Sequence, residues 1–183
     1  MVKSYFDNLE EVVSFFGRLK LLICPHCRCI GFLIRHGFLR GYAEGKGSTL
    51  VDRGCRVFCS NRNRRKGCGR TFSILNSAFI KNNTVTAKTM SRFLVNIASG
   101  MNRLKAFTMS GSLFTASSCY RIFNRVKLAQ AHIRTLLLSA QPPPDGVGLL
   151  DPVVQTILHL NSIFPLSSCP VSAFQSRFQV SFI

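Results

Sequence analysis

The residues with the clearest chemistry are two pairs of cysteines. Cys24 and Cys27 have the Cys-x-x-Cys spacing, and Cys59 and Cys68 follow further along the chain. A Cys-x-x-Cys turn directs two thiolates at one centre, and a second pair about thirty residues later can complete the tetrahedral sulfur shell that Zn²⁺ prefers. The sequence therefore predicts one structural zinc ion per chain, bound by these four thiolates.

The second cysteine pair is spaced less regularly than the first. Eight residues separate Cys59 from Cys68, whereas two to four are usual in such sites. Gly69 follows Cys68 directly, and a glycine suits a tight turn that needs a positive φ angle. The glycine favours Cys68 as a ligand in spite of the long spacing.

The chain has eight cysteines, so other ligand sets are open. Cys55 is a rival partner for Cys59, and His26 or Cys29 can substitute in the first pair. The cysteines can instead be reduced structural residues, or form disulfides in a secreted protein. No apolar segment of a secretory signal opens the chain, which favours the metal site.

Strand-like runs lie between and after the cysteine pairs. Residues 32–39 and 49–58 have this character, and the glycine-containing segment 44–48 between them has the composition of a hairpin turn. Residues 70–75 alternate polar and apolar side chains, as a third strand does. Together these runs predict a small antiparallel zinc ribbon over residues 21–75.

Charge is the second strong feature of the chain. There are 24 lysines and arginines against 7 acidic residues, for a formal net charge of +17, and residues 53–144 contain no acidic residue. This bias indicates a polyanionic partner, and its extent favours nucleic acid over anionic lipid. Around the second cysteine pair, either a solvated loop or a set of phosphate contacts is expected from Arg62, Arg64, Arg65, Lys66 and Arg70.

Apolar residues change their spacing after residue 84, from the twos of strands to the threes and fours of helices. The pattern predicts a helix from Thr84 or Thr86 to Gly100, a short helix over residues 102–109, and a longer helix that begins near Thr115. This order over residues 84–138 is typical of a helix-turn-helix domain, whose third helix enters the major groove of DNA. Its inward side is expected to hold Cys119, Phe123, Val126, Ile133 and Leu137. Its base-contacting residues are expected to be Ser117, Ser118, Arg121, Asn124 and Arg125.

The two ends of the chain carry further patterns. Residues 1–20 predict an amphipathic helix that begins at about residue 4 and ends at residue 19. Three prolines at 142–144 predict a linker, because a helix cannot continue through them. The rest of segment 139–183 is an apolar tail, which either packs onto the domain or docks on another subunit. The predicted fold class is α+β, a small antiparallel zinc ribbon followed by a helical helix-turn-helix domain.

The order of these parts resembles the N-terminal region of bacterial insertion-sequence transposases over roughly residues 20 to 138. The matching motifs are Cys24-Pro25-His26-Cys27, Ile34-Arg35-His36-Gly37-Phe38, Arg56-Val57-Phe58-Cys59 and Gly67-Cys68-Gly69-Arg70-Thr71-Phe72-Ser73. In such proteins the ribbon and helices bind the DNA ends of the element, so the resemblance implies double-stranded DNA as the partner. The catalytic domain of such transposases is missing, because two-metal strand transfer needs several convergent carboxylates. After Asp52 only Asp145 and Asp151 remain, and no enzymatic activity is expected.

These patterns predict a zinc-dependent, double-stranded DNA-binding protein that is cytoplasmic and nucleoid-associated. No apolar run reaches the ~18 residues that span a membrane, and either a homodimer or a separate catalytic subunit is compatible with the sequence. An RNA-binding or ribosome-associated zinc-ribbon protein is the alternative, which would need exposed aromatic stacking platforms. An enzyme with catalytic zinc would keep an open coordination position and usually mix its ligand types.

Overall fold

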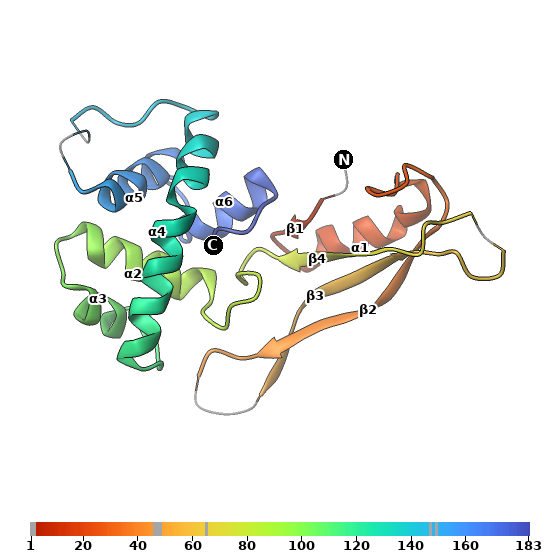
Figure 1. The fold of residues 1–183 in the computed structure, drawn as a ribbon, viewed down its shortest axis with the longest axis horizontal. Coiled ribbons are helices and arrows are strands. Elements are labelled where there is room, and N and C mark those ends of the chain that lie inside the picture. Colours follow the sequence, from red (N-terminus) through yellow and green to blue (C-terminus); the bar gives the residue numbers. More distant parts are fainter. Residues whose placement is uncertain (1–2, 46–48, 65, 147, 149) are drawn as a thin grey trace. The chain divides into compact units, whose positions relative to one another are not determined.

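The chain folds into two units that each have a core of their own (Figure 1). The computed structural model describes residues 3–45, 49–64, 66–146, 148 and 150–183. Unit 1 comprises Met1–Ala43 and Ser48–Ser77, and unit 2 comprises Glu44–Gly47 and Ala78–Ile183. Unit 1 contains the sheet and unit 2 most of the helices, so the predicted α+β class is confirmed.

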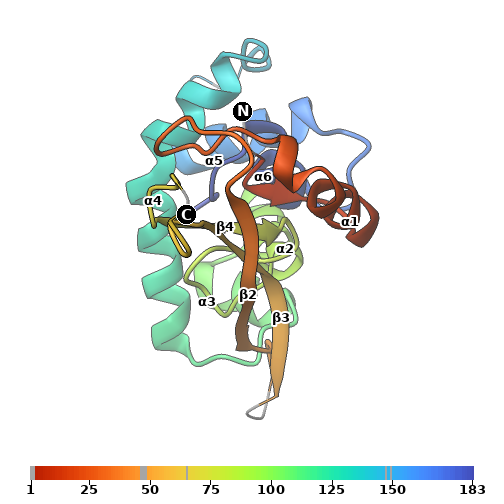
Figure 2. The ribbon, with the colours of Figure 1, turned by 90° about the vertical axis from the view of Figure 1, so that its right-hand side faces the viewer.

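Unit 1 is built on a four-stranded sheet in the order β1-β4-β3-β2. Strands β2 (Leu33–Tyr42), β3 (Leu50–Cys59) and β4 (Thr71–Asn76) pair antiparallel in succession, and the short β1 (Tyr5–Phe6) pairs parallel to β4. Figure 2 shows β2 and β3 as a long twisted ribbon. The three predicted strands are present, and β2 forms one edge of the sheet.

The N-terminal helix begins later than the sequence pattern predicts. Helix α1 covers Leu9–Gly17, after Asn8, whose side chain accepts a hydrogen bond from the Glu11 N–H at 2.9 Å. Residues 5 and 6 lie in β1 instead, in register with Leu75 and Asn76. The expected start near residue 4 is therefore wrong. Residues 5 and 6 pair with the edge of β4, and this pairing excludes them from the helix. A short 3-10 helix, η1 (Leu19–Leu21), follows α1.

Cysteine side chains account for three of the nine buried residues that the structure describes in the small core of unit 1. Its buried apolar side chains come from β1, α1, η1 and the sheet, namely Phe6, Phe15, Leu19, Leu33, Val57 and Ile74. Three buried cysteines, Cys24, Cys55 and Cys59, belong to the same cluster. The packing of unit 1 therefore depends directly on the chemical state of its cysteines.

Unit 2 begins with three helices at the predicted places. They are α2 (Ala87–Ala98), α3 (Arg103–Met109) and α4 (Ala116–Leu138). Thr86 caps α2 by accepting from the Thr89 N–H, and Asn102 caps α3 by accepting from the Lys105 N–H. Gly100 has a φ of +86° just after α2, which is the conformation expected of a helix stop.

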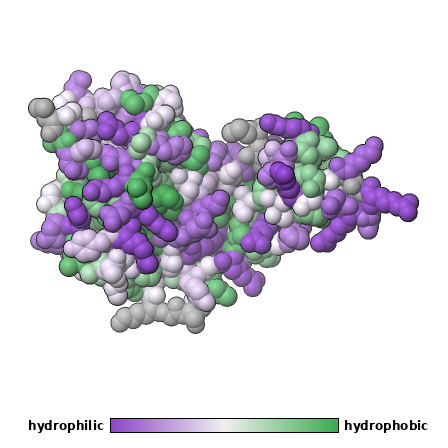
Figure 3. All heavy atoms as spheres, viewed as in Figure 1, coloured by the Kyte–Doolittle hydropathy of each residue, from purple (hydrophilic) through white to green (hydrophobic). Residues whose placement is uncertain are grey.

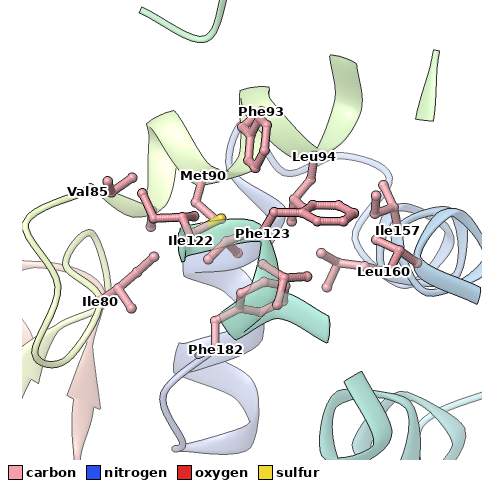
Figure 4. Packing of buried hydrophobic residues seen from close by; sticks show 14 of the residues in the cluster. Ile80, Val85, Met90, Phe93, Leu94, Ile122, Phe123, Ile157, Leu160 and Phe182 are labelled. Atoms are coloured by element: carbon pink, nitrogen blue, oxygen red, sulfur yellow. The ribbon is translucent and has the colours of Figure 1, made fainter. Parts of the chain in front are cut away.

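The apolar tail completes the core of unit 2. Helices α5 (Pro152–Ile163) and α6 (Pro170–Phe178) contribute buried side chains to the same cluster as α2, α3 and α4. In Figure 4, Ile157 and Leu160 of α5 and Phe182 near the C-terminus lie around Phe123 of α4. Of the two expectations for the tail, packing onto the domain is the one observed.

No helix within the described residues is both long and apolar enough to cross a membrane.

Candidate metal centre and nucleic-acid interface

The four cysteines that the spacing selected lie together in unit 1. The Sγ atoms of Cys24, Cys27, Cys59 and Cys68 all lie within 4.8 Å of one another. The Sγ atoms of Cys24 and Cys68 are 3.8 Å apart, and those of Cys27 and Cys59 are 3.7 Å apart. The four residues are positioned to hold a metal ion.

The sulfur separations match a tetrahedral site. A zinc–thiolate bond is about 2.3 Å long, and a regular tetrahedron with that bond length places its ligands about 3.8 Å apart. Two of the six separations, 3.8 and 3.7 Å, fall at this value, and all six lie within 4.8 Å. The cysteine group therefore has the size and the donor chemistry of a four-coordinate sulfur site.

A tight turn presents the first two ligands. The Cys24 N–H donates to the carbonyl of Cys29 at 2.9 Å, and the Arg28 N–H donates to the carbonyl of Cys24 at 3.0 Å. Arg28 has a φ of +64°, a conformation for which glycine would be the usual choice. The two backbone bonds fold the segment back on itself and bring Cys27 beside Cys24.

The long spacer of the second pair is an excursion closed at its base. The Gly69 N–H donates to the carbonyl of Cys59, and the Cys59 N–H donates to the carbonyl of Arg70, both at 2.9 Å. Gly69 has a φ of +71°, and a Cβ there would lie 2.7 Å from the Asn61 side-chain nitrogen. These two hydrogen bonds hold the ends of the eight-residue loop together, and they bring Cys68 next to Cys59.

The thiols of the group differ in their acidity. A hydrogen bond from the backbone of Cys29 lowers the pKa of Cys27 to about 6. Burial raises the pKa of Cys59 to about 12, partly offset by the Cys68 N–H, which donates to the Cys59 Sγ at 3.4 Å. A bound cation would supply the positive charge that the buried Cys59 thiolate needs, so metal binding at this site should release protons.

The rival ligands lie outside the group. Cys55 is buried in the core of unit 1, and burial raises the pKa of its thiol. The His26 ring lies at the edge of Phe72, with 6.4 Å between ring centroids, and the Cys29 thiol donates to the carbonyl of Cys27. Among the described residues, only the four cysteines form a group of three or more donors that could hold a metal.

Two further cysteines have packing roles in unit 2. The buried Cys119 thiol donates to the carbonyl of Arg103 at 3.3 Å, and burial raises its pKa. The Cys169 Sγ lies 3.4 Å from the hydroxyl of Ser91. Both residues belong to or pack against the helical core, and neither is part of the cysteine group that could hold a metal.

The loop between Cys59 and Cys68 presents basic side chains to solvent. Arg62, Arg64 and Lys66 are exposed, as is Arg70 just before β4, while Arg65 lies outside the described residues. The Arg62 guanidinium lies 5.4 Å from the centroid of the Phe58 ring. Figure 3 shows hydrophilic side chains extending from the end of unit 1 that carries this loop.

Helix α4 has a buried side and a polar side along its N-terminal half. Ile122 and the predicted inward residues Cys119, Phe123 and Val126 are buried, as are Ile133 and Leu137 further along. The polar side carries the exposed side chains of Ser117, Arg121, Asn124 and Arg125, with Ser118 half-buried beside them. Because the buried side fixes the rotation of the helix, these polar side chains have a defined direction.

A pocket of about 260 Å³ with both polar and apolar lining residues lies against this part of α4. Ser118, Arg121 and Arg125 line it from the helix, and Asn82, Asn83 and Thr84 line it from the loop before α2. The three loop residues are a part of the site that the sequence patterns do not identify. The run of polar side chains just before the α2 cap was the feature that could have indicated them.

Three carboxylates of the chain, those of Asp52, Glu44 and Asp151, have structural partners. Asp151 caps α5 by accepting from the Val153 N–H at 2.9 Å. Asp52 forms an ion pair with Arg40 at 3.1 Å. Glu44 accepts from the Thr86 N–H and from the Thr89 hydroxyl, both at 2.9 Å. Each of these carboxylates therefore holds local structure together.

No protein-family model matches this chain, and neither a curated protein sequence nor a solved structure matches it. The case for a function therefore comes from the two sites themselves.

Proposed function

We propose that this protein binds double-stranded DNA through α4 and that the cysteine group holds one structural Zn²⁺. The observation that carries the proposal is the polar side of the N-terminal half of α4. There Arg121, Asn124 and Arg125 are exposed together on a helix whose opposite side is buried. A rigid helix that presents these side chain types is suited to contact base edges.

The chemistry of those side chains fits the major groove. Arginine bonds bidentately to guanine, and asparagine bonds bidentately to adenine. The groove is wide enough to admit an α-helix, and in helix-turn-helix proteins the N-terminal residues of the third helix make the base contacts. Helices α2, α3 and α4 follow one another in the order that this arrangement requires.

The pocket beside α4 suits a backbone phosphate next to the contacted bases. Two guanidinium groups, two amides and two hydroxyls line it together with three apolar side chains, and its lining contains no carboxylate. The positive end of a helix dipole lies at its N-terminus, where Ser118 lines the pocket, and the first turn of α4 contains no acidic residue that would offset it. A phosphate held there would fix the position of α4 along the duplex.

The cysteine group supports a structural role for its metal. Four thiolates fill the tetrahedral shell of Zn²⁺ and leave no open position for water or substrate. The metal would hold the turn at Cys24 and the loop between Cys59 and Cys68 in place. The exposed Arg62, Arg64 and Lys66 of that loop then suit contacts with phosphate oxygens that do not depend on base sequence.

These roles match the DNA-end recognition that the motif resemblance to insertion-sequence transposases implies. Asp151 caps α5 and Asp52 pairs with Arg40, and the proposal assigns this chain a recognition role without strand-transfer chemistry. A catalytic partner subunit would then supply any cleavage.

The test is a selection of bound sequences from random DNA duplexes with the zinc-loaded protein, followed by binding measurements on the preferred and scrambled duplexes. Arg121→Ala and Asn124→Ala should each lose about 1–3 kcal/mol of binding free energy on the preferred duplex and little on the scrambled one. Arg64→Ala should weaken both duplexes alike, and should lower the slope of log affinity against log salt by about one.

The matched control is Arg134→Ala, which removes the same charge from an exposed position of α4 about 20 Å further along the helix. It should change the two affinities by the same small amount. If Arg121→Ala and Arg134→Ala behave alike on both duplexes, α4 does not contact bases and the proposal is wrong. Selection of RNA in place of duplex DNA would also overturn it.

A further inference from the structure

Strand β2 exposes aromatic side chains along the edge of the sheet. Phe38 is 50% exposed and Tyr42 is 57% exposed, although aromatic side chains of this size usually lie inside. Exposed and half-buried residues alternate along this part of β2, so Phe38, Arg40 and Tyr42 share its open face. The edge therefore presents two aromatic rings with an arginine between them.

Arginine side chains frame the Phe38 ring. The Arg35 guanidinium lies 4.3 Å from the ring centroid, and the Arg40 guanidinium lies 6.0 Å from it. Arg40 is also held by its ion pair with Asp52 on β3. Arg35 also lies over the Phe16 ring, at 5.3 Å. An exposed ring beside two guanidinium groups, of which only Arg40 is paired with a carboxylate of the described residues, offers a stacking surface and a net positive charge at one place.

A nucleobase is the ligand that this combination fits. Unpaired bases stack on aromatic faces and on guanidinium planes, while the neighbouring phosphates are attracted to arginine. An apolar protein surface would instead have to cover two arginines of the same edge. The net charge of +17 also favours a polyanion.

We propose that the β2 edge binds unpaired DNA bases, with Phe38 as the main stacking residue and Tyr42 as a second one. Arg35 and Arg40 contact the phosphates of the bound strand. The choice of DNA over RNA rests on the function proposed above, whereas the stacking itself does not. Bases inside a duplex are already stacked and paired, so the ligand is a single strand, such as a frayed end beside a bound duplex.

The spacing along β2 sets the length of strand that is bound. Phe38 and Tyr42 are four residues apart, which corresponds to about 13 Å along a strand. Successive bases of one DNA strand rise by about 3.4 Å in a duplex, and an extended single strand covers more per nucleotide. A strand that lies along β2 therefore reaches both rings within roughly four nucleotides.

The absence of tryptophan from the sequence makes a direct test feasible. Phe38→Trp in the full zinc-loaded protein places the only tryptophan of the chain at the proposed stacking position, where it can be excited selectively over the three tyrosines. A tryptophan in place of Leu166, which is 99% exposed, is the matched control. Titration with a thymidine oligonucleotide should quench the fluorescence of Phe38→Trp to saturation, and should leave that of Leu166→Trp nearly unchanged. Equal quenching of both variants, or of neither, would overturn the proposal.

Affinity measurements separate this site from the duplex site. Phe38→Ala should weaken single-strand binding by about 5- to 150-fold, Phe38→Tyr should restore it, and neither change should alter duplex affinity. Thermal unfolding and zinc content establish that the variants are folded. An equal loss on duplex and single strand would overturn the stacking proposal, whereas tighter binding of RNA of the same sequence would overturn the choice of DNA as the ligand. A wild-type protein that binds single strands but no duplex would refute the function proposed above and leave stacking intact.

Discussion

The metal site makes the sharpest prediction, because the chain offers a matched pair of cysteines on one strand. Cys55 and Cys59 both lie in β3 and both are buried, but only Cys59 belongs to the four-cysteine group. We expect Cys59→Ser to lose the zinc and Cys55→Ser to keep one zinc per chain. The hydroxyl that replaces each thiol is the same, so the comparison isolates ligation from the cost of burying a polar group.

The size of the effect follows from the small core of unit 1. Its cluster contains six large apolar side chains, Phe6, Phe15, Leu19, Leu33, Val57 and Ile74. At about 1.5–3 kcal/mol each, they contribute about 9–18 kcal/mol in total. Binding of structural zinc by small domains is worth about 10–16 kcal/mol. Loss of the metal therefore removes a contribution as large as the whole apolar core, and unit 1 should unfold.

Unit 2 should remain folded under the same change. Its core contains none of the four ligands, so Cys59→Ser and metal chelation should both leave its helical circular dichroism largely intact. The assay is zinc content by elemental analysis together with limited proteolysis, which should cut between residues 3 and 77 only. Full zinc content in Cys59→Ser, or an equal loss of zinc in Cys55→Ser, would refute the assignment of the ligands.

Further expected outcomes concern the buried thiols, the helical core and the start of α4. Burial raises the pKa of Cys55 and Cys119, so both should resist iodoacetamide at pH 8 until the chain unfolds. Any stability gained from keeping these thiols neutral is lost as pH rises through their raised folded pKa values. Phe93→Ala, at a fully buried ring that packs on Phe107 and Phe123, should lower the free energy of unfolding of unit 2 by about 3–5 kcal/mol in a denaturant titration. Thr115→Asp should weaken duplex binding at low salt more than Thr115→Ala does, because it adds a carboxylate at the proposed phosphate-facing end of α4; equal affinities would contradict that orientation.

The sequence was sufficient for features that depend on neighbouring residues. The Cys-x-x-Cys spacing, the glycine after Cys68 and the helical spacing after residue 84 each predict a local structure that is present. The eight-residue spacer made Cys68 the least secure ligand. Its place was decided by the backbone bonds from Gly69 to Cys59 and from Cys59 to Arg70. These bonds form where the end of β3 meets the residues just before β4. The number of residues between two cysteines does not show whether such strand ends meet.

The features that the sequence did not predict depend on contacts between distant segments. Tyr5 and Phe6 are compatible with a helix by spacing, and only the free edge of β4 makes them a strand. The loop residues Asn82, Asn83 and Thr84 line the pocket together with residues of α4 that follow them in the sequence by about 35 positions. Only the packing of the folded chain brings the two segments together. The exposure of Phe38 is of the same kind. Its neighbours in sequence are apolar enough to suggest a core position, and its place at the sheet edge exposes it.

The capping of the helices in unit 2 gives an independent reason to assign DNA contact to α4. At the N-terminal end of α2, the Glu44 carboxylate accepts from the Thr86 N–H and the Thr89 hydroxyl. This carboxylate takes the place that a phosphate would need at the start of α2. Asn102 satisfies the Lys105 N–H at the start of α3. Thr115 makes no such bond to the backbone of α4, and its hydroxyl lies 2.8 Å from that of Ser117 instead. The Ser118 N–H is satisfied by the Thr115 carbonyl at 3.0 Å, but no side chain caps the start of α4. Under the function proposed above, a phosphate oxygen beside Arg121 and Arg125 would accept from the N–H groups that precede Ser118.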